Sequence, residues 1–182
     1  MRCSWVAENC DVYARYHDEE WGRPLHNEQK LFEMLILEGF QAGLSWLTVL
    51  KKREAFRAEF ADFVPEKVAD FTEDKIERML NNPQIIRSRQ KISAAINNAA
   101  VFLKIQKEYG SFDKYIWHFT GGETVKYNIF PPRTHNELSD RIAKDLRKRG
   151  MKYVGSVIIY SYLQAIGIID DHEPQCFCYV KS

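Results

Sequence analysis

Two cysteines and two histidines, residue types that bind metals, lie near opposite ends of the 182-residue chain. Cys3 and His17 are near the start, and His172 and Cys176 are near the end, separated from each other by three residues. Two thiolates and two imidazoles suit tetrahedral Zn²⁺, and four protein ligands leave no position open for catalysis. The pattern therefore admits a structural zinc that joins the termini. The alternative is a buried cysteine beside a capping histidine, and Cys178 is a second candidate for the place of Cys176.

An acidic residue falls on the apolar face of a predicted helix. After Asn27, which can cap a helix, Leu31, Met34 and Leu35 recur at helical spacing, and Glu38 follows on the same stripe. Burying a carboxylate without a partner is costly, so the simplest interpretation places Glu38 at the solvated edge of the stripe. The other interpretation is a buried carboxylate that binds a ligand.

Five large aromatic residues fall in about the first quarter of the chain, on both sides of this acidic residue. An anion among aromatic rings can bind a flat cationic ligand through stacking, cation–π attraction and a charged hydrogen bond. Ordinary core packing is the competing explanation for the same rings. The candidate ligand-binding aromatic residues are Trp5, Tyr13, Tyr16, Trp21 and Trp46.

Basic residues follow a predicted turn between two helices. A helix capped by Thr72 is expected to stop at 81–83, and a long helix is expected after the turn at 84–86. Backbone N–H groups and basic side chains at such a helix start can bind phosphates, although a solvated charged face is the commoner outcome. Basic runs at 51–53 and 147–149 give a weaker signal. The basic residues at the long helix are Arg87, Arg89 and Lys91.

Helical periodicity extends over most of the remaining chain. One helix is predicted from about Ser45 to Phe60, the long helix is expected to end at Gly110, and two more are expected over 139–149 and about 156–166. Glycine and proline pairs mark 120–136 as a loop. Apart from the short stretch at 157–160, alternating strand patterns are missing, so the sequence predicts a single all-α domain.

The composition excludes several classes of protein. With 45% apolar and 28% charged residues, the chain is not expected to be disordered. No apolar run approaches the length of a membrane span, and the start lacks a signal-peptide core, so neither membrane insertion, secretion nor a disulfide framework is expected. The formal net charge is only +1, so a nucleic-acid-binding face would require local segregation of charge.

Motifs along nearly the whole chain resemble those of the bacterial 3-methyladenine DNA glycosylase I family, constitutive alkylation-repair enzymes of the helix-hairpin-helix superfamily. The matching segments are Tyr-His-Asp-Glu-Glu-Trp-Gly at 16–22, Leu-Phe-Glu-Met at 31–34, Leu-Glu-Gly-Phe-Gln-Ala-Gly-Leu-Ser-Trp at 37–46, Val-Leu-Lys-Lys-Arg-Glu at 49–54, Ile-Ile-Arg at 85–87, Lys-Arg-Gly-Met-Lys-Tyr-Val-Gly at 148–155, and Asp171-His172 with Cys176.

This resemblance implies an all-α domain over 1–182, with a helix-hairpin-helix around 72–109 and one structural Zn²⁺ at Cys3, His17, His172 and Cys176. It implies a base pocket in which Glu38 and Tyr13 hydrogen-bond the base, Tyr16 and Trp46 pack on it, and Trp21 and Trp5 line the wall. It also places the gap left by the extruded nucleotide near Gly43 and Leu44, and the DNA backbone at Ile85, Ile86 and Arg87.

The implied activity is hydrolysis of the N-glycosidic bond of 3-methyladenine in double-stranded alkylated DNA, which releases the free base and leaves an abasic site. Methylation at N3 makes the base a cation in the nucleotide, so it leaves neutral and needs no strong general acid. Glu38 is then expected to recognise the base, and no lysine stands out as a nucleophile for strand cleavage. A monomer in the bacterial cytoplasm, with no obligate protein partner, is the corresponding expectation.

Two departures from the superfamily pattern qualify this expectation. Gln84 stands where the hairpin usually has a glycine, and the usual catalytic aspartate is not evident. Asp170 and Asp171 are expected instead to orient His172 or to cap a helix end. Two rival functions stay open at this point: a non-catalytic zinc-stabilised helical DNA-binding module, and a zinc hydrolase or deaminase with an open metal position.

Overall fold

The computed structural model describes residues 1–7, 9–127 and 133–179, and these residues are mainly helical. The elements are α1 (Asp11–Glu19), α2 (Glu28–Gln41), α3 (Trp46–Lys51), α4 (Arg53–Glu59), η1 (Ala61–Phe63), α5 (Pro65–Ala69), α6 (Glu73–Leu80), α7 (Arg89–Tyr109), α8 (Phe112–Trp117), η2 (His118–Thr120), β1 (Val125–Lys126), α9 (Glu137–Lys148), α10 (Ser156–Ala165) and β2 (Ile169–Asp170).

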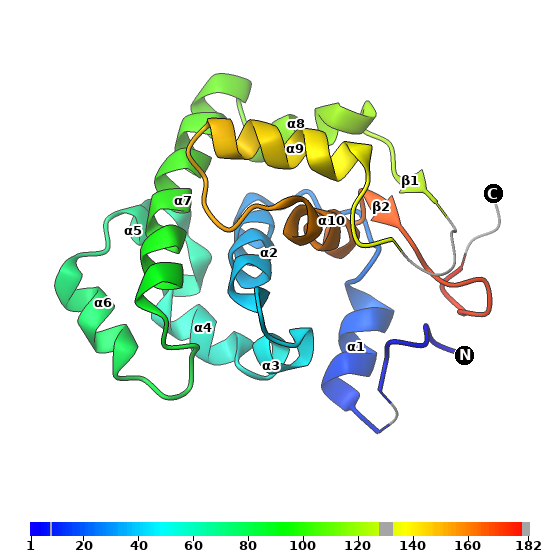
Figure 1. Cartoon of the computed structure of the whole chain (residues 1–182), viewed down its shortest axis with the longest axis horizontal. Helices are drawn as coiled ribbons and strands as arrows, with labels where there is room; N and C mark the ends of the chain where they lie inside the picture. Colours follow the sequence, from blue (N-terminus) through cyan, green and yellow to red (C-terminus); the bar gives the residue numbers. More distant parts are fainter. Residues whose placement is uncertain (8, 128–132, 180–182) are drawn as a thin grey trace.

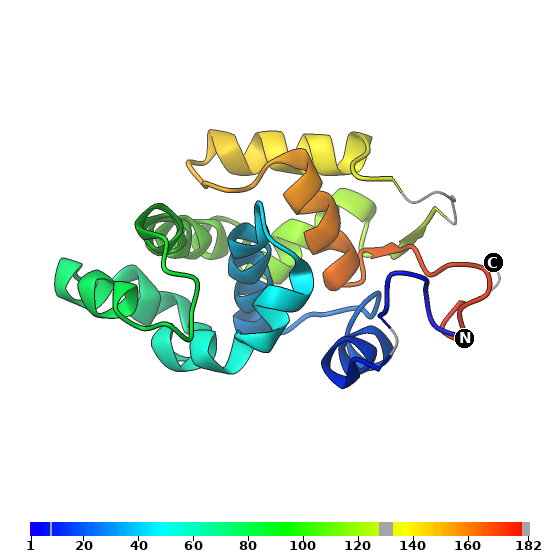
Figure 2. The ribbon, with the colours of Figure 1, turned by 60° about the horizontal axis from the view of Figure 1, so that its bottom comes forward.

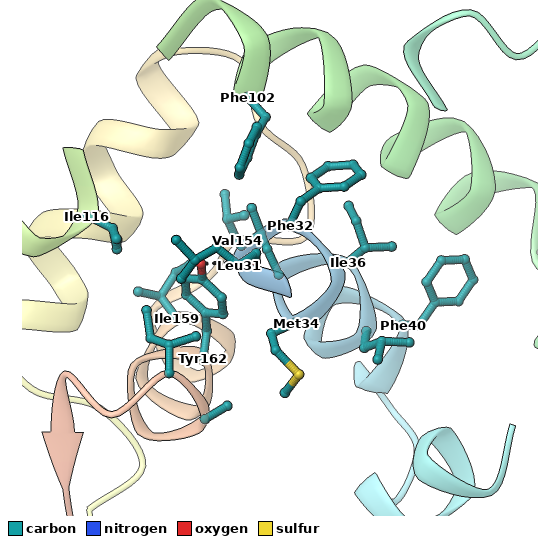
Figure 3. Close-up of a cluster of buried hydrophobic side chains, with 14 of the residues drawn as sticks. Leu31, Phe32, Met34, Ile36, Phe40, Phe102, Ile116, Val154, Ile159 and Tyr162 are labelled. Carbon is teal, nitrogen blue, oxygen red and sulfur yellow. Dashed lines mark hydrogen bonds between the residues drawn. The ribbon is translucent and has the colours of Figure 1, made fainter. Parts of the chain in front are cut away.

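Helix α2 lies at the centre of the core. Its N-terminus is capped by Asn27, whose side chain accepts a hydrogen bond from a backbone N–H of the first turn, as predicted. The helix is buried on nearly all sides, which is typical of a helix surrounded by protein. Figure 3 shows its side chains between Phe102 of α7 and Tyr162 of α10. The Tyr162 hydroxyl donates a hydrogen bond to the carbonyl of Leu31 (3.1 Å), which fixes α10 against α2.

The remaining helices are arranged around α2. Helices α4 to α7 lie toward one end of the molecule, α3 lies between α2 and α1, and α8, α9 and α10 cover another side (Figures 1 and 2). The N-terminal segment lies at the opposite end, beside α1, and the described segment after β2 lies at the same end (Figure 1). There the Phe177 N–H donates to the carbonyl of Met1 (2.9 Å), which joins the two termini. Among the described residues, no helix is long and apolar enough to cross a membrane.

The single helix predicted from Ser45 to Phe60 is wrong, because α3 ends at Lys51 and α4 begins at Arg53. Lys52 lies between them, and its Nζ donates hydrogen bonds to the carbonyl oxygens of Pro83 (2.9 Å) and Gln84 (3.1 Å). The Lys52 side chain therefore connects the junction of α3 and α4 to the turn between α6 and α7. Periodicity alone does not reveal it, because both short helices keep apolar residues on the core side.

The segment 120–136, predicted as a loop, contains more structure than expected. Val125 and Lys126 form β1, which pairs in parallel with β2. Strands of two residues are too short to show an alternating pattern in the sequence. The stretch at 157–160, the one place where a strand was conceivable, is helical within α10. Residues 128–132 of the predicted loop lie outside the described part of the chain.

We expect a side chain at Gly167 to destabilise the fold far more than one at Gly121. Both residues have positive φ (+73° and +67°), but a Cβ at Gly167 would lie 2.2 Å from the carbonyl carbon of Arg23, whereas nothing lies within 4 Å at Gly121. Gly121→Ala should lower the free energy of unfolding by about 1 kcal/mol through backbone strain. Gly167→Ala should lower it by at least about 2 kcal/mol more. Denaturant unfolding of both variants measures the difference, and equal losses would contradict the close approach.

Candidate active site and metal centre

A cavity of about 300 Å³ opens between α1, α2, α3 and α10 and is closed by the segment that follows β2. All six residues predicted to form a ligand pocket line this cavity, although they come from four separate parts of the chain. The aromatic and acidic lining residues are Trp5, Tyr13, Tyr16, Trp21, Trp46 and Glu38. The further lining residues are Gln41, Arg133, Thr134, Ser161, Gln164, Asp171, His172, Glu173 and Pro174.

Glu38 is buried in this cavity and is not at a solvated edge. Its exposed fraction is 3%, and burial raises the pKa of its carboxyl group to about 8. The side chain is therefore mainly protonated at neutral pH while no ligand is present, in contrast to the ionised carboxylate assumed from the sequence. A positively charged ligand would oppose this shift in pKa, because an opposite charge nearby favours the ionised form.

The aromatic rings form a connected wall around Glu38. Trp5 lies with its ring centroid 5.1 Å from those of Tyr13 and Trp21, and Tyr16 lies 5.4 Å from Trp46. Burial, and secondarily the charge of Glu38, raises the pKa of the Tyr16 hydroxyl well above its usual value. The indole N–H of Trp46 is buried and has no acceptor within the described part of the chain. The wall thus offers flat apolar surfaces together with neutral hydrogen-bond donors.

The loop between α2 and α3 places Trp46 at the cavity. Gly43 has φ +77°, a left-handed conformation that glycine adopts without strain. The Gln41 side chain donates a hydrogen bond to the carbonyl of Leu44 (2.8 Å), and Ser45 then caps α3 by accepting from a backbone N–H. Leu44 is left 39% exposed at the tip of the loop.

Polar residues on the α10 side of the cavity were not predicted from the sequence. Ser161 and Gln164 lie three residues apart on α10, which is otherwise apolar on this face, and this spacing was an available signal. Asp171 follows β2, and its Oδ2 accepts hydrogen bonds from the Tyr160 hydroxyl and the Gln164 amide. Asp171 was expected to orient His172 or to cap a helix end, but its carboxylate bonds to α10 side chains and lines the cavity, because only the fold brings it there.

The predicted metal ligands lie together at the joined termini. Possible ligand atoms of Cys3, His17 and Cys176 lie within 4.8 Å of one another, and those of His172, Cys176 and Cys178 form a second such group. Cys176 belongs to both groups, so the structure gathers the four predicted ligands around it. Cys178 also lies close to His172 and Cys176, so it stays a candidate for the place of Cys176.

Acidic side chains orient both histidines. The His17 Nδ1 lies 2.8 Å from Asp18, and the His172 Nδ1 lies 2.7 Å from Asp170, so each ring is left with its Nε2. The His172 Nε2 is buried and has no hydrogen-bond partner among the described residues. Burial lowers the pKa of His17, which favours the neutral imidazole that binds metals. This buried donor set fits a metal cation, and the expected orienting role of Asp170 matches its contact.

The Cys/His cluster is also part of the cavity wall. The His172 ring centroid lies 4.7 Å from that of Trp21, and the His17 ring lies 5.3 Å from that of Trp5. Gly22 permits the close approach of His172, since a Cβ there would lie 2.5 Å from the imidazole Cε1. Loss of the cluster would therefore disturb the aromatic wall directly.

The predicted DNA-contacting residues around the start of α7 differ in their surroundings. Ile85 is buried and Ile86 is partly buried, and both pack on the core, whereas Arg87 is exposed. Arg89 and Lys91 differ from the prediction, because their side chains are held by internal partners. Arg89 forms ion pairs with Glu73 and Glu77 of α6. Lys91 donates to two backbone carbonyls at the end of α2.

A second turn between helices carries the glycines that the α6–α7 turn lacks. Gly150 (φ +98°) and Gly155 flank the turn between α9 and α10, and Gly155 precedes α10 without a side-chain cap. Lys152 is exposed within it. The glycine pair and the run of basic residues at 147–149 were signals for this turn in the sequence.

A helical fold with an acidic residue buried in a cavity of aromatic rings, beside a Cys/His cluster, is the framework of a base-excising enzyme. The family model for methyladenine glycosylases matches residues 5–179, and the chain belongs to this family. It is 45% identical over 181 residues to "DNA-3-methyladenine glycosylase 1" of Escherichia coli K12, an alignment that covers 98% of this chain and 96% of that protein.

Solved structures agree with this assignment. A crystal structure of 3-methyladenine DNA glycosylase I matches with a TM-score of 0.95 and 45% identity, covering 99% of this chain and all of that one. A Y16F variant of a 3-methyladenine DNA glycosylase I, solved in complex with 3-methyladenine, matches with a TM-score of 0.93 and 39% identity, covering 99% of this chain and 98% of that one.

We expect Glu38→Gln to make stability less dependent on pH. The raised pKa of Glu38 means that the unfolded chain loses this proton near pH 4.5 and the folded chain only near pH 8, so native stability falls as pH rises between these values. Glutamine removes the effect. The variant should therefore gain stability over the native protein progressively from pH 5 to pH 8, by up to about 3 kcal/mol at pH 7. Thermal unfolding across this range measures it, and a pH-independent difference would contradict the burial effect.

Proposed function

We propose that this chain is a monofunctional DNA glycosylase that hydrolyses the N-glycosidic bond of 3-methyladenine in alkylated double-stranded DNA and leaves an abasic site. The observation that carries the proposal is the buried Glu38, for which the described residues provide no ion pair, in a cavity walled by aromatic rings. Relatives 45% identical over nearly the whole chain are named for this activity, and a related structure was solved with 3-methyladenine.

The cavity suits a base that carries positive charge. A 3-methyladenine nucleotide is cationic, and its ring can stack on Trp46 and Tyr16 while Glu38 and Tyr13 hydrogen-bond its edge. Breaking the glycosidic bond transfers the bonding electrons to the base, which leaves neutral, and water adds to the sugar carbon and loses a proton to solvent. Asp171 and Glu173 also contribute acidic side chains to the cavity, which favours positive charge on the base and on the sugar.

The Cys/His cluster is proposed to hold one structural Zn²⁺. Cys3, His17, His172 and Cys176 would be the ligands, with Cys178 as the alternative to Cys176. Four protein ligands would make the ion a clip between the termini and leave no open position for activating water. A zinc hydrolase or deaminase needs such a position, so this set of ligands favours the glycosylase.

The DNA backbone is proposed to contact the face that bears the two inter-helical turns. Arg87 is exposed, and no ion pair or hydrogen bond of its side chain is found in the described part of the chain. The α9–α10 turn adds Lys152 and the uncapped start of α10, where backbone N–H groups can bind a phosphate. Both turns would bind the DNA backbone as a helix-hairpin-helix motif does, without recognising the base sequence. A non-catalytic DNA-binding module would need these turns but not the cavity.

Base release from methylated DNA tests the enzymatic proposal directly. The native protein should release 3-methyladenine, identified by chromatography, and leave alkali-labile abasic sites without cutting the strand. Glu38→Ala should slow release about tenfold to a hundredfold, because it removes a charged hydrogen bond worth about 1.5–3 kcal/mol. Trp46→Ala, the companion variant, should mainly weaken binding of free 3-methyladenine by removing a stacking surface.

The outcomes separate the pocket from DNA binding. Both variants should bind undamaged DNA as the native protein does. Native rates of release in a folded Glu38→Ala protein would place the pocket elsewhere, and no release by the native protein would favour the DNA-binding module.

The zinc proposal predicts one tightly bound ion per chain, measured by metal analysis of gently purified protein. Cys176→Ser should lower the zinc content and the melting temperature together, because the energy of metal binding contributes directly to folding. Cys10→Ser is the matched control, since Cys10 lies outside both ligand groups. Zinc-free native protein, or equal melting of the two variants, would be incompatible with a structural zinc at this cluster.

A further inference from the structure

The side chain of Lys91 reaches from the start of α7 to the end of α2. Its Nζ donates hydrogen bonds to the carbonyl oxygens of Phe40 (2.8 Å) and Ala42 (2.6 Å). Carbonyls at a helix C-terminus lack partners within the helix and carry the negative end of its dipole. Helix α2 has no basic residue in its own last turn, and Ala42 does not adopt a left-handed cap (φ −48°, ψ 116°). Lys91 therefore adds a charged side-chain partner for two carbonyls at the C-terminus of α2.

The contact of Lys91 with these carbonyls lies directly before the exposed loop of the site. The carbonyl of Ala42 is bonded to the nitrogen of Gly43, whose φ of +77° begins the loop. At the other end of this loop, the Leu44 N–H donates to the carbonyl of Gln41 (2.7 Å). The ammonium group of Lys91 thus fixes the side of the Gly43–Leu44 loop that leaves α2, a loop otherwise exposed to solvent.

The same ammonium group also contacts the turn between α9 and α10. It lies 6.0 Å from the ring centroid of Tyr153 in that turn. Asn98, two helical turns further along α7, accepts from the Lys152 N–H and donates to the Lys152 carbonyl, both at 2.8 Å. One face of α7 therefore holds the loop and the glycine-flanked turn in a fixed relation to each other.

We propose that Lys91 is a positioning residue for base excision, which sets the Gly43–Leu44 loop relative to the DNA-binding turns and makes no phosphate contact of its own. The inference rests on the proposed function, because the loop matters only if DNA is bound there. Two short hydrogen bonds and partial burial occupy the ammonium group, whereas Arg87, four residues earlier, is exposed. Desolvation also lowers the pKa of Lys91, as expected for an amine turned inward.

Three variants test this assignment: Lys91→Met keeps the aliphatic stem, Lys91→Arg keeps a charged donor, and Arg87→Ala is the control for a phosphate contact. Each is measured for single-turnover release of 3-methyladenine, for affinity to free 3-methyladenine, and for affinity to undamaged DNA across a series of salt concentrations. Amide hydrogen exchange at 42–45 reports the loop itself, and melting temperature and circular dichroism report folding.

Lys91→Met should slow release between about tenfold and a hundredfold, because misplacing a positioning loop by a small distance is costly. Its exchange at 42–45 should rise, while its affinity for free base and its salt dependence on undamaged DNA should stay native. Lys91→Arg should recover most of the rate. Arg87→Ala should instead reduce the salt dependence by about one phosphate contact.

Three results would overturn the assignment, and a fourth bears on the proposed function. A reduced salt dependence in Lys91→Met would make Lys91 a phosphate contact. Native release and native exchange would mean that the loop does not depend on it. Should Lys91→Met fail to fold, a Lys91→Arg protein that folds but releases base no faster than background would equally reject the assignment. A native protein that releases no base would refute the proposed function and leave the exchange measurement to decide the role of Lys91.

Discussion

The chemistry of the site depends on keeping Glu38 out of water, at a cost in stability that the surrounding packing must offset. A buried carboxyl group with no charged partner is unfavourable when ionised, so it holds its proton up to a pKa of about 8. Helix α2 places it at the centre of the molecule, where the surrounding helices cover the rest of that helix. Aromatic rings on one side and α10 on the other complete the enclosure. The core, the cavity and the reactivity of the site therefore follow from one arrangement.

The cavity around Glu38 is built from segments that are far apart in the sequence. Two of these segments, from near the start and the end of the chain, are joined to each other. Trp5 and Trp21 pack against His17 and His172, so the Cys/His cluster supports the aromatic wall from behind. Glu173 strengthens the same junction, because its carboxylate accepts hydrogen bonds from the Ser4 N–H (2.8 Å) and hydroxyl (2.6 Å). A small Cys/His cluster can thus stabilise the pocket, to whose lining it contributes His172.

Local patterns in the sequence predicted many features that depend on a few neighbouring residues, although the Thr72 side chain makes no capping hydrogen bond to α6. The cap at Asn27, the long helix ending at Gly110 (φ +85°) and the helices closed by Gly150 and Gly167 all agree with the structure. The motifs also identified every aromatic residue of the cavity. The break at Lys52, strands β1 and β2, and the place of Asp171 depend on tertiary contacts, so periodicity could not reveal them. Arg89 and Lys91 show the same limit: their positive charge was evident, but their internal partners come from α6 and α2.

The raised pKa of Glu38 also reconciles recognition with catalysis in the proposed reaction. A carboxylate already ionised in the free enzyme would bind the cationic nucleotide strongly, and losing that attraction as the base leaves neutral would raise the barrier. When it binds the cation, Glu38 gives up to solvent a proton that burial favours, and it takes a proton back once the base is neutral. The net attraction is therefore smaller and its loss costs less. As the bond breaks, positive charge moves toward the sugar, where the acidic side chains of the same cavity still favour it. Burial of one glutamate can therefore select charged lesions without trapping them.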